Sequence, residues 1–289
     1  MLRPGLFVLL LAAVLLVAGC GSLPYGVDGN LSDDWKPPPS PSSFRPAAEG
    51  CFDKLEPAAP LASYAPFDCA ERHVAEAFFV GDLPDGGSDT DAARKAAAAE
   101  CSKRADVFTG AQWRTGRLRL QPVLPGPEGW KAGARWFRCD LAEVDSGTDR
   151  VVSREGTLRD SLKGDAALAL RCFNPSVRDG DVRDMAVVPC DRDHHAEFTG
   201  LWTAPDVALN KLQNDDRMAA GCRSVIADYT GVPDDENLQY RSGWLAFAPS
   251  RSEWAAVIRS IQCFLWLADD KMRGSYKDAG TAKLPIHYA

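Results

Sequence analysis

Eight cysteines that follow Cys20 constrain this chain more than any other feature, because their spacing repeats. The first four stand 18, 32 and 38 residues apart, and the next four stand 18, 32 and 41 residues apart. Two equal gaps and a near-equal third indicate an internal duplication with a period near 121 residues. The eight positions are Cys51, Cys69, Cys101, Cys139, Cys172, Cys190, Cys222 and Cys263.

Other side chains repeat with the same period. A phenylalanine follows the first cysteine, a His-x-x-Glu motif follows the second, and a tryptophan precedes the fourth by nine residues. We therefore expect two copies of one domain, at residues 48–165 and 168–282. The matching positions are Phe52 and Phe173, His73 and His194, Glu76 and Glu197, and Trp130 and Trp254.

Four cysteines in each copy indicate two disulfides per copy if the chain is exported. Three pairings are open within a copy, and the duplication implies that both copies use the same one. Metal ligation by the thiolates is the alternative, although the sequence has no Cys-x-x-Cys pair of the kind that zinc ribbons use. We favour bonds from first to second and from third to fourth cysteine, namely Cys51–Cys69, Cys101–Cys139, Cys172–Cys190 and Cys222–Cys263.

The residue pattern predicts an α+β fold in each copy, with a mixed or antiparallel sheet and a helix on one face. Alanine-rich segments before the third cysteine favour the helix. The Gly-Thr-Leu-Arg segment at 156–159 is expected to add an edge strand. Expected strands are 51–52, 69–80 and 135–139 in the first copy and 168–173, 187–201 and 258–267 in the second; expected helices are 91–108, 206–229 and a short one at 252–257.

The N-terminus has the pattern of an export signal. Residues 1–19 hold one charge, Arg3, followed by an apolar run that is short for a membrane span of about 20 residues. The run ends Val-Ala-Gly before Cys20, as in a bacterial lipobox, where the cysteine is diacylated and the peptide is cut just before it. An uncleaved anchor or an ordinary secretory signal is the alternative. We expect a lipid anchor at Cys20, on the extracytoplasmic side of the cell membrane.

Residues 20–47 are rich in proline and serine and predict an extended tether. The net charge of −7 argues against nucleic acid as a partner, which requires lysine and arginine to neutralise phosphates.

The repeated motifs together resemble the septum formation domain family of actinobacterial envelope proteins. These motifs are Cys-Phe, Cys-x-x-x-His-x-Ala-Glu, an alanine-rich segment ending at a cysteine, a tryptophan before the last cysteine, and Gly-[Thr/Ser]-x-[Arg/Lys]. The resemblance covers both copies. It implies a lipid-anchored or single-span protein with extracytoplasmic domains and a role in the division septum or cell wall, and it supplies no catalytic residues.

The His-x-x-Glu motifs are the strongest candidate binding residues: His73 with Glu76, and His194 and His195 with Glu197. Histidine and carboxylate are common metal ligands, so a small-ligand or metal-binding module is one hypothesis. On a strand, however, residues three apart point to opposite faces. We favour a structural role, with the histidine bonded to backbone beside the disulfide and the glutamate at a solvent face.

Sequence motifs of the common enzyme classes are absent, including Gly-x-Ser-x-Gly, His-Glu-x-x-His and the phosphate-binding loop. We expect a non-enzymatic binding or scaffolding protein with no cofactor and no metal, whose partner is an envelope protein or cell-wall component. A cell-wall hydrolase is the weaker alternative.

The lipobox predicts that Cys20→Ala abolishes lipid attachment and signal processing, because the acylated thiol is lost. Mass spectrometry of the mature N-terminus checks this. A wild-type chain that starts at another residue and carries no lipid would contradict it.

Overall fold

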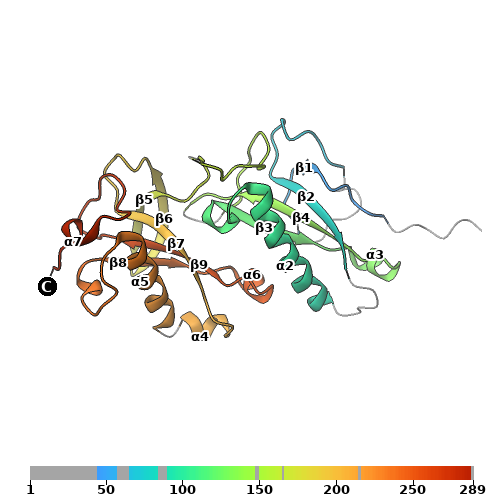
Figure 1. Ribbon diagram of the computed structural model, residues 1–289. Helices are drawn as coiled ribbons and strands as arrows, with labels where there is room; N and C mark the ends of the chain where they lie inside the picture. The colour runs from blue at the N-terminus through green and yellow to red at the C-terminus, as the bar shows by residue number, and fades with distance from the viewer. Residues whose placement is uncertain are drawn as a thin grey trace, which may run out of the picture. The chain divides into compact units, whose positions relative to one another are not determined.

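Two antiparallel sheets carry the fold (Figure 1). The computed structural model describes residues 44–56, 65–83, 90–146, 150–164, 166–213 and 216–287. All of them belong to one compact unit that runs from Ser43 to Ala289. The expected signal peptide, Cys20 and most of the expected tether lie outside the described residues.

The first sheet has the strand order β1-β2-β4-β3. Its strands are β1 (Gly50–Phe52), β2 (Ala75–Asp82), β3 (Leu118–Val123) and β4 (Trp136–Glu143). The central strand β4 is buried from Trp136 to Ala142, since it has a neighbour on each side. We call this sheet and its helices the first half.

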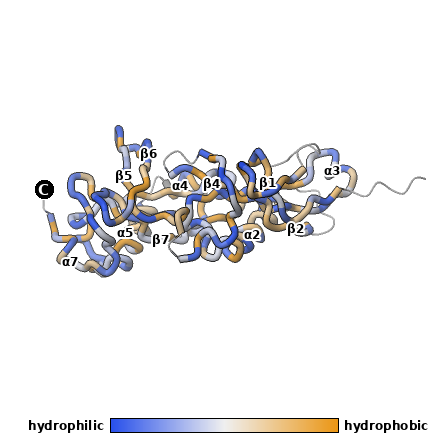
Figure 2. The backbone as a smooth tube through the Cα atoms, turned by 90° about the horizontal axis from the view of Figure 1, so that it is seen from above, coloured by the Kyte–Doolittle hydropathy of each residue, from blue (hydrophilic) through white to orange (hydrophobic). Residues whose placement is uncertain are grey.

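The second sheet has the order β6-β5-β7-β9-β8. Its strands are β5 (Cys172–Arg178), β6 (Asp181–Val188), β7 (Ala196–Thr203), β8 (Gly243–Phe247) and β9 (Ser260–Trp266). Figure 2 shows the hydrophilic tip of the β5–β6 hairpin. We call this sheet and its helices the second half.

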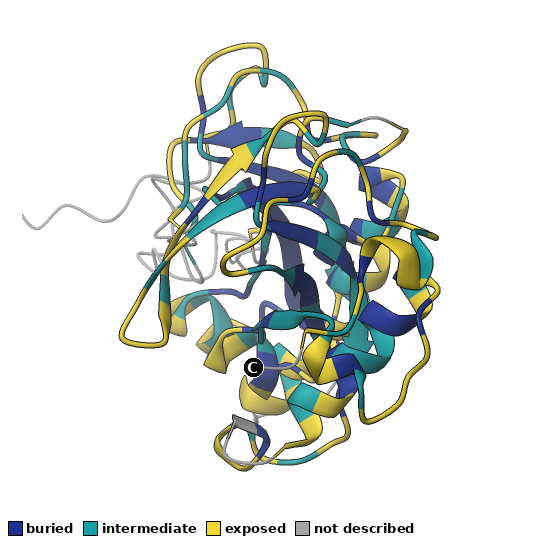
Figure 3. Cartoon of the chain, turned by 90° about the vertical axis from the view of Figure 1, so that its left-hand side faces the viewer, coloured by how far each residue is buried: buried dark blue, intermediate teal, exposed yellow. Residues whose placement is uncertain are grey.

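One long helix packs on each sheet. Helix α2 (Thr90–Thr109) buries Ala97, Cys101, Ala105 and Phe108, whose spacing of three and four residues forms one face. Small alanines let this face approach the strands closely. Figure 3 shows buried strands inside the fold and exposed outer faces on the helices.

The second half uses α5 (Arg217–Thr230) in the corresponding place, against β7, β8 and β9. Its Gly221 is required by close packing, because a Cβ there would lie 2.1 Å from the Trp202 ring. Shorter elements complete the described chain: 3-10 helices η2 (Trp113–Thr115) and η3 (Leu238–Tyr240), and helices α3 (Pro127–Lys131), α4 (Leu209–Gln213), α6 (Arg251–Ala255) and α7 (Gly280–Lys283).

Four disulfides join the pairs that the sequence favoured. In each half one bond closes an 18-residue loop beside the sheet, and the other ties the long helix to a central strand. The loop closed by each bond restricts the unfolded chain, which stabilises the fold by about 3–4 kcal/mol per bond in the chain-entropy model. The bonds are Cys51–Cys69, Cys101–Cys139, Cys172–Cys190 and Cys222–Cys263.

The halves share local detail beyond the disulfides. The β2–β4 pairing has an irregularity between Ala77 and Phe79, and the β7–β9 pairing has one between Phe198 and Gly200. A tryptophan–arginine contact also recurs. The Arg135 guanidinium lies 4.2 Å from the Trp130 ring and donates to that residue's carbonyl; Arg259 and Trp254 do the same at 4.3 Å.

Several expectations about secondary structure were wrong. The strand expected at 69–80 begins only at Ala75, and the strand expected at 168–173 is β5, Cys172–Arg178. The segment 187–201 is not one strand, because β6 ends at Val188 and β7 starts at Ala196, and β6 belongs to a hairpin turned at Asp179-Gly180, both at positive φ. The segment 206–229 is divided into α4 and α5. The segment 156–159 is a turn and not an edge strand, with Gly156 at φ 80°.

Hydrogen bonds connect the two halves. Arg114, in η2 of the first half, donates through Nη2 to the Ser260 carbonyl at 3.3 Å, and its own carbonyl accepts from Gln262 Nε2 at 2.8 Å. The Ser146 hydroxyl donates to the Met185 carbonyl. Ile258 of the second half lies in the hydrophobic core of the first. Among the described residues, no helix has the length and apolar character needed to cross a membrane.

Candidate functional site

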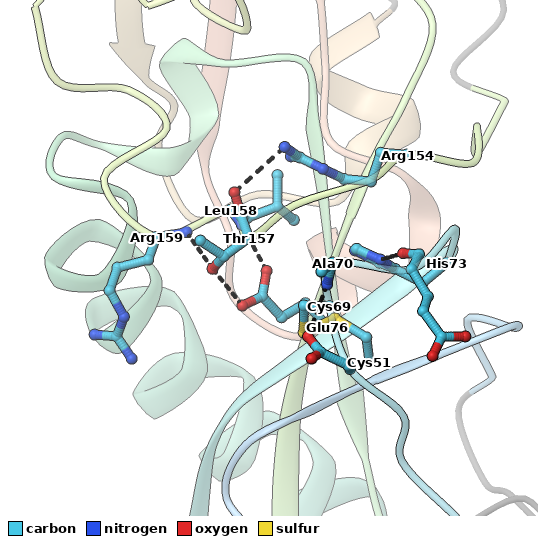
Figure 4. Close-up of a disulfide and its surroundings, with 11 residues drawn as sticks. Cys51, Cys69, Ala70, His73, Glu76, Arg154, Thr157, Leu158 and Arg159 are labelled. Carbon is cyan, nitrogen blue, oxygen red and sulfur yellow. Dashed lines mark hydrogen bonds between the residues drawn. A yellow bond between two sulfur atoms is a disulfide. The ribbon is translucent and has the colours of Figure 1, made fainter.

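The glutamate of the first His-x-x-Glu motif holds a turn from the end of the first half. Glu76 lies on β2 and is only 6% exposed. One carboxylate oxygen accepts from the Thr157 hydroxyl and the other from the Leu158 backbone N–H, both at 2.6 Å (Figure 4). Hydrogen bonds to a charged carboxylate are short and strong, so this contact fixes the turn on the strand.

Glu197 on β7 makes the same contact in the second half. Its oxygens accept from the Ser275 hydroxyl at 2.6 Å and from the Tyr276 backbone N–H at 2.8 Å. Tyr229 at the end of α5 adds a third donor, with its hydroxyl 2.7 Å from Glu197. We call the contacts of Glu76 and Glu197 with these turns the two carboxylate clamps.

Each clamped turn also bonds to the disulfide loop and to the helix end. In the first half, Gly156 donates to the Cys69 carbonyl at 2.7 Å and Asp160 donates to the Phe108 carbonyl at 2.9 Å. In the second half, Gly274 donates to Cys190 at 2.7 Å and Asp278 donates to Tyr229 at 2.9 Å. Each turn therefore joins three separate segments of the chain: the strand, the disulfide loop and the end of the long helix. The two halves have matching sets of these contacts.

His73 is 1% exposed and stands two residues before β2. Its Nδ1 lies 2.8 Å from the Glu71 carbonyl. Because a carbonyl oxygen only accepts, we assign the ring proton to Nδ1, which leaves Nε2 as an acceptor. That Nε2 is buried without a hydrogen-bond partner among the described residues.

His194 repeats this environment. It is fully buried, its Nδ1 lies 2.8 Å from the Arg192 carbonyl, and its buried Nε2 likewise has no partner in the described part of the chain. His195 differs, since it is half-buried and its Nδ1 lies 3.0 Å from the Leu267 carbonyl. The first half has Val74 at the place of His195.

The expected backbone contact of the histidines is present, but the expected solvent position of the glutamates was wrong. Both glutamates are buried, because a hydroxyl and a backbone N–H replace the water that a carboxylate otherwise needs. The histidine and glutamate of one motif also bond to different neighbours, so the motif does not present two free groups to one ligand.

Burial changes the pKa values of groups around the clamps. It raises the pKa of Tyr229, and the hydrogen bond to Glu197 raises it further. It also lowers the pKa of Arg154, which the carboxylates of Glu143 and Glu76 oppose. Tyr229 therefore stays protonated as a donor and is unsuited to act as a base or nucleophile.

One group of three potential metal ligands occurs among the described residues: Cys51, Cys69 and Glu76, whose ligand atoms lie within 4.8 Å of one another. Both sulfurs belong to a disulfide, and both carboxylate oxygens already accept hydrogen bonds. Cysteine binds a metal as the thiolate, so these disulfide sulfurs do not form a site in the oxidised chain.

The sequence interpretation missed the partners of the glutamates. The Gly-[Thr/Ser] echo at 156–157 and 274–275 was visible, but its hydroxyl was not connected with Glu76 or Glu197. A hydroxyl that follows a glycine in both segments was the available signal. No such signal marked Tyr229, because the matching position in the first half is Phe108, which has no hydroxyl.

The family comparison supports the resemblance found in the sequence. A family model described as septum formation matches residues 48–263, about three quarters of the chain. The chain belongs to the septum formation family. The match is one continuous stretch that includes both His-x-x-Glu motifs and all eight disulfide cysteines of this family member. No curated protein and no solved structure matches the chain.

The carboxylate clamps predict that Glu197→Gln lowers the free energy of unfolding by about 1–3 kcal/mol, since an amide nitrogen cannot accept from the Ser275 or Tyr276 donors. Tyr229→Phe is the matched control. It should cost no more than about 1 kcal/mol, because the first half has Phe108 there and the other two donors remain. Urea denaturation checks both. Equal stability of Glu197→Gln and wild type would contradict the clamp.

Proposed function

We propose that this member of the septum formation family is an exported, lipid-anchored envelope protein on the extracytoplasmic side of the cell membrane. Three features support the proposal. The N-terminal sequence has a lipobox ending at Cys20, the family match points to septum formation, and the fold contains four disulfides. Structural disulfides of this kind persist in oxidising compartments and are rare in the cytosol.

We also propose that residues 48–165 and 168–282 are tandem copies of one domain. The supporting observations are the matched disulfide loops, the matched irregularities on β2 and β7, and the two carboxylate clamps. Equivalent contacts at a constant offset are expected when one ancestral sequence has been doubled.

Within that envelope role, we propose a binding or scaffolding function rather than catalysis. The observation that carries this proposal is that polar atoms of both His-x-x-Glu motifs already form hydrogen bonds with other groups of the chain. Both oxygens of Glu76 and of Glu197 accept from the turns, and Nδ1 of each preceding histidine bonds a carbonyl. Catalytic acids and bases need a free position facing a substrate.

A small-ligand or metal-binding module is the second candidate, favoured by one observation. Nε2 of His73 and of His194 is buried and has no hydrogen-bond partner among the described residues. A neutral imidazole whose Nδ1–H bonds a carbonyl is also the usual state of a histidine that binds metal through Nε2.

The two candidates differ in what His73→Ala and His194→Ala should do. A structural role predicts a lower midpoint of thermal unfolding, by roughly 2–4 °C for each kcal/mol lost in a chain of this size. It also predicts no response to Zn²⁺ in wild type or variants. His195→Ala is the control, since that ring is half-buried. Saturable Zn²⁺ binding near one ion per half, lost in both variants, would favour the second candidate.

Crosslinking in membranes tests the scaffolding proposal directly. The full chain, crosslinked in dividing cells and recovered through an affinity tag, should carry envelope or cell-wall components enriched at the septum. Cys20→Ala, which removes the site of lipid attachment, should recover less of them if the lipid anchor positions the chain. Hydrolysis of cell-wall polymer by the purified chain would contradict the proposal.

A further inference from the structure

A cavity of about 180 Å³ lies where the first half meets the second sheet. The first half contributes its edge around η2, β3 and the end of β4, and the second half contributes β5, β6, β8 and β9. We call it the joint cavity. Residues of the first half that line it include Arg114, Arg117, Leu118, Val144, Asp145 and Ser146.

The second half supplies an aromatic wall. Phe264 contacts Phe173 edge-on, with ring centroids 5.6 Å apart, and contacts Phe247 edge-on at 5.4 Å. Met185 lines the same wall and is 1% exposed. Such a surface favours an apolar group, and aromatic rings gain further from edge-to-face contacts.

The acidic groups in the lining are already occupied. Glu253 accepts from the Ser250 backbone N–H at 2.8 Å and lies 3.8 Å from Arg114. Asp145 lies 3.3 Å from Arg150. Neither carboxylate is therefore a free counter-charge for a cationic ligand.

Arg117 is a lining cation with a spare donor. Its Nη2 donates to the Ala167 carbonyl at 3.3 Å and lies 3.7 Å from Glu143, beyond hydrogen-bond distance. Its Nε is buried with no hydrogen-bond partner among the described residues. An unsatisfied guanidinium N–H in a buried place costs free energy, which an anionic acceptor would recover.

The volume limits the size of the ligand. Cavities of about 150 Å³ in protein interiors accept a single benzene ring, whereas pockets for drug-sized molecules begin near ~300 Å³. The joint cavity, at about 180 Å³, thus suits one ring or a branched aliphatic group with one small polar substituent.

We propose that the joint cavity binds a small carboxylate with an apolar body of about one ring. The carboxylate accepts from Arg117, and the apolar body packs on Phe173, Phe247 and Phe264. This site is separate from the carboxylate clamps and from the His-x-x-Glu motifs. Because its walls come from both halves, the bound ligand stabilises the joint between them, as any ligand does for the state that binds it.

Titration of the intact purified chain with benzoate tests the proposal, followed by the protein's own NMR signals. Saturable shifts are expected at the amides of Gly116 and Phe247, with a dissociation constant on the order of 1 mM for so small a ligand. Benzyl alcohol and benzylamine, which keep the ring and lack the carboxylate, should bind at least about tenfold more weakly. Equal binding of the three probes, or no saturable binding of benzoate, overturns the proposal.

Variants locate the site. Arg117→Met should weaken benzoate binding by about tenfold or more, since it removes the charged donor. Ala248→Leu should abolish binding, because it places a larger side chain in the cavity lining. Arg119→Met, a change of the same kind on β3 outside that lining, should leave it unchanged. Full-strength binding by folded Arg117→Met and Ala248→Leu together would place the ligand elsewhere and overturn the assignment.

Discussion

Each half of this structure depends on a buried carboxylate that has no access to bulk water. Removing a charged oxygen from water is costly unless donors replace the water. Glu76 and Glu197 each obtain two donors from a turn, and Glu197 obtains a third from Tyr229. The turn must then lie where the strand, the disulfide loop and the end of the long helix converge. The disulfide and the clamp restrict the same region, one covalently and the other through hydrogen bonds.

The cysteine spacing predicted one pairing used twice, the favoured choice among the three open pairings is the one present, and the alanine-rich run predicted the position of α2. Both predictions rest on local residue patterns or on repetition, and these can be read from a single sequence. The clamps were not predicted, because Glu76 and Thr157 are 81 residues apart and meet only in the folded chain. The β5–β6 hairpin was missed for a different reason, since the Asp179-Gly180 turn is a local signal that the strand assignment overlooked.

The joint cavity could not be predicted from the sequence at all. It exists because the edge of the first half does not fill the space beside the aromatic wall of the second. Neither periodicity nor spacing describes how two surfaces of one chain fit together. Hydrogen bonds from Arg114 and Gln262 set that fit, and nothing in the residues around them marks them as partners.

The corresponding sheet positions of the two halves show how one architecture supports different surfaces. Arg138 and Asp140 flank Cys139 on β4 and form a buried pair at 2.6 and 2.7 Å, with the guanidinium 4.1 Å from the Phe52 ring. Gln262 and Phe264 flank Cys263 at the matching places on β9. Replacing both members of a buried ion pair leaves no unpaired buried charge, so this difference need not alter the fold. It alters the side chains on that face instead: the first sheet holds a buried ion pair there, while in the second Phe264 lines the joint cavity. Two different residues at these positions, within a fold held by disulfides and clamps, therefore change which side chains the two sheets present there.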